Sequence, residues 1–275
     1  MADPDARDAL ALARRTGLAD LAWAAGAGES ARPCVRGVLP LIDPARPGSV
    51  TVALKYAELA DARSLARAAG GEALLVLPDD AGAGRTVLRC RVSVAEDREG
   101  TVFDGDLLDQ VLRRWPPSRV LADSPLLRRE HWWYLPRLLV RLQPVAVERL
   151  AAGQGADHLL VTMSGRGLQA VGVARPEDLT IEARGSFDVA APPAPPGTPA
   201  DGAAMLHGHA QSPDRERWSQ WSWIGHWDAP TLHAMDARGT LGLGPVPGVL
   251  ARWRTQRRLE KACRAGLASV EARGL

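Results

Sequence analysis

The segment from Gly84 to Leu142 constrains the fold most, because it joins an alternating strand, a helix with a defined end and an apolar strand in one run. Its first part, GRTVLRCRVSV, alternates apolar residues with polar or basic ones. Successive side chains of a β-strand point to opposite faces, so one face would be buried while Arg89 and Arg91 would lie on the other. The segment therefore predicts a core strand that carries a basic face.

The rest of this segment predicts a helix and a second strand. The helix covers Leu107–Trp115 and ends at the two prolines that follow it, since proline restricts the residue before it and lacks an amide hydrogen. The stretch Trp132–Leu150 is rich in aromatic and branched residues and predicts a strand, in which Pro136 indicates an edge or a bulge.

The residues before this segment predict further elements of a mainly β fold. Residues 5–25 have helical spacing, and Asp61–Ala69 predicts a short helix. A pair of strands joined by the turn DPARPGS is expected at Cys34–Ile42 and Ser49–Leu54, followed by a strand at Ala73–Leu77.

The second half of the chain repeats this order in looser form. Strands are predicted at His158–Met163, Leu168–Val173 and Leu179–Glu182, and a proline-rich surface loop at Ala191–Pro199. Two strands joined through SPDRE resemble in pattern the earlier pair joined through PDDAGAG, and a helix over Pro247–Ala272 ends the chain. This similarity indicates an internal duplication, with units at residues 1–150 and 151–275.

Composition and motif searches remove several classes of function. The net charge of +2 is too small to indicate a polyanion-binding protein, and the basic C-terminal helix is interpreted as an amphipathic cover helix rather than a nucleic-acid contact. Three widely spaced cysteines fit neither a disulfide framework nor a metal site. The sequence holds no signal-peptide core, no membrane-spanning run and no nucleophile-elbow, P-loop, dinucleotide or zincin motif. A cytoplasmic protein is therefore expected.

The order of these segments resembles a known family. The strand end VALK, the strand GRTVLRCRV, the helix LLDQVLRRWPPSR and the strand WWYLPRLLVRL are similar to the flavin mononucleotide (FMN)-binding split β-barrel of the pyridoxamine 5′-phosphate oxidase superfamily, in its divergent actinobacterial form. The resemblance covers about residues 30–150, and the end of the chain resembles the C-terminal part of the same group. It implies a mainly β split barrel with flanking helices, duplicated as an intrachain pseudo-dimer or assembled as a homodimer, with FMN between two barrels.

The resemblance also implies a set of cofactor-binding residues. In the oxidases a V-L-L-K strand end and an S-R-K helix start bind the flavin phosphate; VALK assigns Lys55 to the first, and ARS assigns Arg63 and Ser64 to the second in part. Basic side chains suit a phosphate, so Arg89 and Arg91 are added at the anionic end, and Trp132 and Trp133 are expected nearest the ring. The residues that grip the substrate phosphate have no match, so pyridoxamine phosphate oxidation is not predicted and no catalytic residue is assigned.

The expected function is thus an FMN- or deazaflavin-dependent oxidoreductase that acts on an unidentified small molecule, with no membrane or nucleic-acid partner. Two alternatives stay open. His207 and His209 stand two apart on a predicted strand and would point the same way, but no spacing fixes a third ligand, so no metal site is predicted. One of these histidines would instead be the axial ligand of a haem, because split-barrel relatives include haem-binding proteins. The other alternative is a cofactor-free regulatory barrel, which the incomplete phosphate motif favours.

Overall fold

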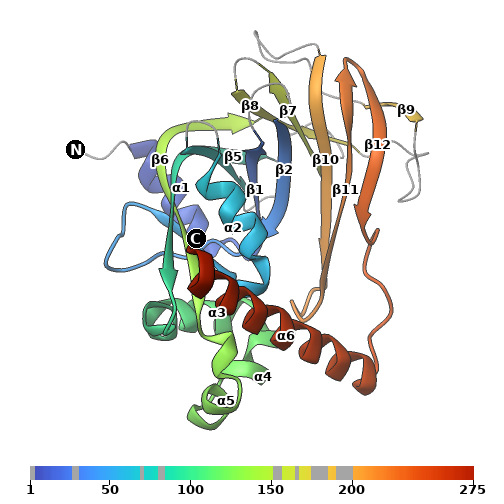
Figure 1. The fold of residues 1–275 in the computed structure, drawn as a ribbon. Helices are drawn as coiled ribbons and strands as arrows, with labels where there is room; N and C mark the ends of the chain where they lie inside the picture. The colour runs from blue at the N-terminus through green and yellow to red at the C-terminus, as the bar shows by residue number, and fades with distance from the viewer. Residues whose placement is uncertain are drawn as a thin grey trace.

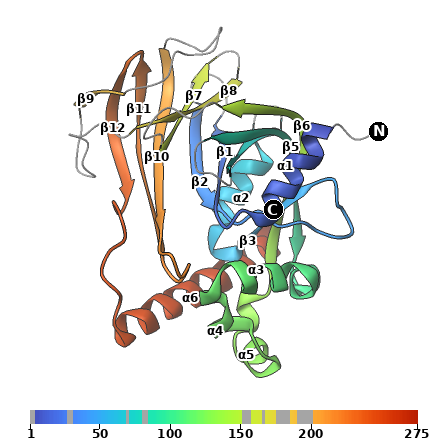
Figure 2. The same cartoon turned by 180° about the vertical axis from the view of Figure 1, so that it is seen from behind.

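A computed structural model of the chain describes residues 4–26, 31–68, 71–79, 84–150, 157–164, 167–174, 185–189 and 201–275. Two six-stranded antiparallel sheets make up most of it, standing side by side in both views (Figures 1 and 2). Among the described residues, no helix combines the length and apolarity that crossing a membrane requires.

The first sheet curls toward a barrel. Its strand order is β2-β1-β4-β5-β6-β3, and a bridge between Leu41 and Thr51 joins the chain beyond β2 to β3 at the opposite edge. The strands are β1 (Ala19–Ala25), β2 (Arg32–Val38), β3 (Val50–Lys55), β4 (Glu72–Pro78), β5 (Arg85–Asp97) and β6 (Arg137–Leu150).

The second sheet has the same topology as the first. Its order is β8-β7-β10-β11-β12-β9, which is the order of the first sheet with six added to every strand number. Its strands are β7 (His158–Ser164), β8 (Gly167–Val173), β9 (Gly185–Asp188), β10 (Asp201–Gln211), β11 (Trp218–Asp228) and β12 (Thr231–Gly239). The fold is therefore mainly β and built as a duplicated split barrel, as predicted.

Helices fill and flank the first sheet. The α-helices are α1 (Pro4–Arg15), α2 (Leu59–Ala66), α3 (Leu108–Arg114), α4 (Arg119–Ala122), α5 (Pro125–Glu130) and α6 (Val249–Arg273). Leu59, Ala62 and Leu65 of α2 are buried in the barrel core, because apolar residues three apart share one helix face. α6 starts beside the second sheet and runs back to pack on the 3₁₀-turn η2 (Tyr56–Glu58) of the first (Figure 1).

An apolar layer joins the two sheets. It includes Ala22, Val35 and Val76 of the first sheet and Leu159 and Met205 of the second. The backbone amide of Val35 also donates to the sulfur of Met205 at 3.2 Å. Burial of apolar side chains therefore stabilises the contact between the two sheets. Polar side chains in this layer need another explanation, because burying them costs free energy.

The structure corrects three sequence predictions. Residues 19–25 form β1 rather than helix; six of the seven are buried, so the segment lacks the alternation of a half-exposed strand. β2 and β3 lie at opposite edges of the sheet instead of pairing with each other, and β3 pairs with β6. Trp132–Tyr134 forms the 3₁₀-turn η6 ahead of β6. The predicted strand Leu179–Glu182 and the loop Ala191–Pro199 lie outside the described residues.

Candidate functional site

A cavity of about 130 Å³ lies where the two halves of the chain meet. Lys55 and Arg137 line it from paired positions on β3 and β6, and Gln211 and Trp218 line it from the second sheet. Trp218 also contacts Trp115 edge-to-face, with ring centroids 6.2 Å apart. Both halves are therefore needed to enclose this space.

One edge of the cavity carries a charge network. The Arg36 guanidinium donates to Glu58 at 2.6 Å and to Asp61 at 2.5 Å, and Glu58 accepts the backbone amide of Lys55 at 2.8 Å. Burial alone would raise the pKa of Glu58, but the charges of Lys55 and Arg36 outweigh it and hold the pKa at about 2. Glu58 is thus a carboxylate throughout the physiological pH range, and it forms an ion pair with Arg36.

Arg137 lines the cavity without an ion-pair partner among the described residues. Its side chain is 1 % exposed, and it forms no ion pair with any described residue. The guanidinium lies 3.9 Å from the Phe103 ring centroid and 4.2 Å from that of Tyr134, and it donates to the carbonyl of Pro136 at 3.0 Å. Burial lowers the pKa of Arg137. A buried cation held by aromatic faces is therefore available to an anion in the cavity.

Of the seven residues predicted to bind the cofactor, only Lys55 lines this cavity. Arg63 donates to the carbonyl of Gly274 at 2.7 Å and to Ser269, so it holds the last turn of α6. Ser64 accepts a hydrogen bond from the Trp23 indole at 2.9 Å. Both side chains thus have packing roles in this fold.

The two arginines of β5 lie far from Lys55. Arg89 is 3.8 Å from both Glu72 and Glu148, and Arg91 is exposed. On β6, the residue opposite Lys55 is 137 and the residue opposite Arg89 is 146, which places the two cations about 30 Å apart along the strand. One phosphate cannot contact both groups.

The predicted ring-stacking residues, Trp132 and Trp133, do not line the cavity. Trp132 is 48 % exposed, and the Arg264 guanidinium lies 4.9 Å from its ring centroid. Trp133 is 1 % exposed and packs edge-to-face on Tyr134, with centroids 6.2 Å apart. The structure does not bring the seven residues to one place.

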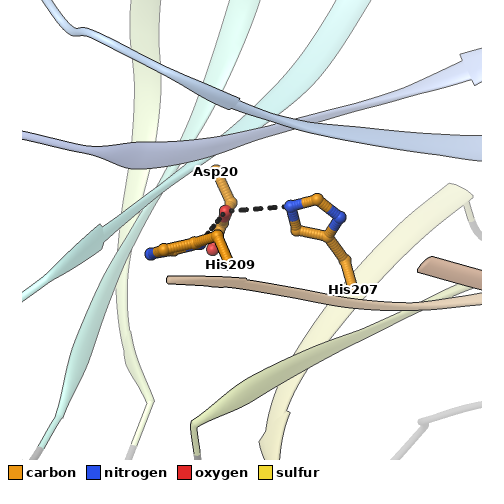
Figure 3. A group of neighbouring side chains, drawn as sticks. All are labelled: Asp20, His207 and His209. Carbon is orange, nitrogen blue, oxygen red and sulfur yellow. Dashed lines mark hydrogen bonds and ion pairs between the residues drawn. The ribbon is translucent and has the colours of Figure 1, made fainter. Parts of the chain in front are cut away.

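A second polar cluster crosses the layer between the sheets (Figure 3). Oδ1 of Asp20 on β1 lies 3.1 Å from Nδ1 of His209 and 3.5 Å from Nε2 of His207, both on β10. Oδ2 of Asp20 accepts from Arg85 at 3.3 Å. Burial alone would raise the pKa of Asp20, but the two neighbouring imidazoles outweigh it and hold the pKa well below its usual range.

Sequence patterns identified only part of this cluster. The spacing of His207 and His209 was visible, but Asp20 lies in a segment with helical spacing and contributes from the other sheet. No local pattern predicts which strands of two stacked sheets face each other.

No protein-family model matches the chain, and no curated protein matches it in sequence. Solved structures are similar to it in part. A protein of unknown function from Agrobacterium tumefaciens is 18 % identical, with a TM-score of 0.35, over 52 % of this chain and 56 % of that one, about half its length. A Clostridium acetobutylicum protein of the pyridoxinephosphate oxidase family, related to a general stress protein, is 8 % identical, with a TM-score of 0.35, over 55 % and 91 %.

A third similar structure covers more of the chain. The pyridoxamine 5′-phosphate oxidase-related, FMN-binding protein of Nostoc punctiforme is 12 % identical, with a TM-score of 0.33, over 78 % of this chain and 90 % of that one. The similar structures thus include proteins of the superfamily that the sequence resembles. At these identities and TM-scores no function is transferred from them to this chain.

Proposed function

We propose that this protein binds a phosphorylated flavin, with FMN as the first candidate, and that its phosphate is held by Arg137 in the cavity between the two halves. The observation that carries the proposal is the burial of the Arg137 guanidinium without an ion-pair partner among the described residues. A buried charge costs several kcal/mol unless it is paired, and a ligand oxyanion would supply the pair. Lys55, at the paired position on β3, adds a second cation.

The neighbouring acid supports this assignment of charges. Glu58 is bonded to Arg36, so Arg36 is neutralised within the protein. Among the described residues neither Arg137 nor Lys55 forms an ion pair, although the charge of Lys55 helps to lower the pKa of Glu58, so both cations can contact a ligand at this cavity. Guanidinium and ammonium groups are the side chains that proteins use most for phosphate.

The fit to a whole flavin is limited by space. Cofactor pockets usually occupy about 300–1,000 Å³, and this cavity of about 130 Å³ accommodates a phosphate group but not an isoalloxazine ring. Flavins supply hydride and electron transfer when bound. Of the seven residues expected from sequence, Lys55 remains a phosphate contact. Arg137 takes the place of Arg63, Ser64, Arg89 and Arg91, and the tryptophans of η6 contribute to packing.

The test compares FMN with riboflavin, which has the same ring but no phosphate. Fluorescence titration of the full chain should show binding of FMN and much weaker binding of riboflavin. Arg137→Met should weaken FMN binding by at least about tenfold, equivalent to one charge-assisted hydrogen bond, whereas Arg91→Met, on an exposed arginine, should leave it unchanged. If Arg137→Met does not fold, Lys55→Met takes its place.

Several outcomes would refute the proposal. Equal affinity for FMN and riboflavin would remove the phosphate contact, as would unchanged FMN binding in the folded variants. The absorption spectrum of the purified protein distinguishes the two alternatives. A Soret band that persists through desalting indicates a haem protein. A protein that retains none of FMN, deazaflavin and haem is a cofactor-free barrel.

A further inference from the structure

The cluster of Asp20, His207 and His209 has the donor set and spacing of a metal site. We infer that it binds one divalent transition-metal ion, with Zn²⁺ as the first candidate, through Oδ1 of Asp20, Nε2 of His207 and Nδ1 of His209. Each of the three residues offers one ligand atom that lies within 4.8 Å of those of the other two. Zinc bonds of about 2.0–2.1 Å in tetrahedral geometry place neighbouring ligand atoms about 3.3 Å apart. The carboxylate-to-imidazole distances of 3.1 and 3.5 Å are close to that spacing.

His207 has an unmet requirement that an ion would satisfy. It is 2 % exposed, and neither ring nitrogen forms a hydrogen bond with any described residue. Its Nε2 faces Asp20 at ion-pair distance but without hydrogen-bond geometry. Buried polar groups without a partner are uncommon in folded proteins. Arg85 binds the other oxygen of Asp20 and so orients Oδ1 toward the two rings, as outer-shell groups do in metal sites.

The duplication shows that the equivalent strands of this fold also bury apolar residues in the layer between the sheets. Asp20 of β1 pairs with Val76 of β4, and the corresponding strands of the second sheet pair Leu159 with His207. Leu159 thus lies on the strand equivalent to that of Asp20, and Val76 on the strand equivalent to that of His207. Leu159 and Val76 are fully buried in the apolar layer. Because burying polar groups costs free energy, the presence of Asp20 and His207 in this layer is explained by a role in binding.

The proposed site has room for a further ligand. His209 lies at the wall of a groove of about 410 Å³ that Asp79, Gln211 and Arg215 also line. Three protein ligands leave a fourth tetrahedral position, which is the arrangement of catalytic rather than structural zinc. Because Arg85 already neutralises one negative charge, we expect micromolar rather than nanomolar affinity. Gln211 lines this groove and the cavity of Arg137, so the two proposed sites are neighbours.

The experiment uses the full chain after treatment with a chelator and desalting. Calorimetric titration should show one Zn²⁺ per chain, and Co²⁺ should give the visible bands of a tetrahedral site, which Zn²⁺ abolishes. His209→Ala and Asp20→Asn should each weaken binding by more than about tenfold, since even outer-shell changes cost that much. Because His209 is partly exposed, His209→Ala is expected to fold, and it tests the metal site if Asp20→Asn does not fold.

A second histidine pair provides the matched control. His226 and His233 face each other on β11 and β12, with ring centroids 6.5 Å apart. His233→Ala should leave zinc binding unchanged. Zinc binding that depends on His233 rather than His209 would overturn the inference, as would the absence of micromolar binding by the folded parent protein. None of these measurements requires a flavin, so the inference and the proposed function fail separately.

Discussion

Replacing Glu58 by glutamine tests two effects of the charge network: its contribution to the stability of the fold, and its influence on ligand binding in the cavity. The substitution keeps the shape of the side chain but removes the charge that Arg36 and Lys55 hold. Because those cations lower the pKa of Glu58 from 4.5 to about 2, the carboxylate stabilises the fold above its unfolded pKa. That contribution is lost as the pH falls from about 4.5 toward about 2.

The magnitude follows from the size of the shift. Each pKa unit corresponds to about 1.4 kcal/mol, which gives an upper value of about 3 kcal/mol for Glu58. The side chain is 22 % exposed, so water screens part of the interaction, and we expect Glu58→Gln to lower the free energy of unfolding by about 2 kcal/mol at neutral pH. The difference between the variant and the parent should become small only as the pH reaches about 2.

Urea unfolding at neutral and acidic pH measures this difference directly. Asp61→Asn is the matched control, because Asp61 binds the same guanidinium but is 42 % exposed and does not line the cavity. It should cost less than Glu58→Gln. A loss for Glu58→Gln that is the same at both pH values would refute the electrostatic reasoning. Glu58→Gln also removes a negative charge beside the cavity, so this variant should bind FMN more tightly than the parent although it is less stable.

Three further predictions concern packing. Gly266→Ala places a Cβ 2.1 Å from the carbonyl oxygen of Tyr56, so it should lower the free energy of unfolding by about 1–3 kcal/mol, although alanine is the better helix former. Ala265→Gly, exposed on the same helix, should cost only the helix propensity of about 1 kcal/mol, and a Gly266→Ala protein as stable as the parent would contradict the close packing. Arg63→Ala should speed amide hydrogen exchange in the last turn of α6, and unchanged exchange there would show that the bonds of Arg63 do not hold that turn. Burial raises the pKa of the Cys34 thiol and raises that of Cys90 to about 12, so alkylation at mildly basic pH should be slow and should reach half-buried Cys34 before Cys90; mass mapping that finds Cys90 modified first would contradict this order.

Local patterns were sufficient for elements whose signal lies within the element itself. The predicted helix Asp61–Ala69 is found as α2 at Leu59–Ala66, and the final helix as α6. The alternating arginine strand is found as β5, although both of its faces are partly covered, because the second sheet packs beside it. Pairing between strands was less predictable: β2 and β3 are neighbours in sequence, but they meet only at the bridge that follows β2.

The candidate sites depend on contacts that no local pattern encodes. Lys55 was identified because a strand-end motif marks it. Arg137 begins β6, whose sequence is typical of a core strand, and its role depends on the cavity around it. Arg63 matched a motif but is used by α6, a helix about two hundred residues away, as the separation of 211 between Arg63 and Gly274 shows. A motif identifies residue types, and tertiary packing decides which of them remain available to a ligand.

The duplication explains how one chain can combine a stable junction with a binding site. In a homodimer of identical barrels, any residue placed at the junction occurs twice, so burying an aspartate and a histidine would be repeated at the symmetric position. In this chain the equivalent strands differ: Asp20 and His207 lie on one pair, β1 and β10, and buried Leu159 and Val76 lie on the equivalent pair, β7 and β4. The apolar position contributes burial to the contact between the sheets, while the polar one is free to bind a ligand. Fusion of the two halves therefore permits an asymmetric site that two identical subunits cannot form.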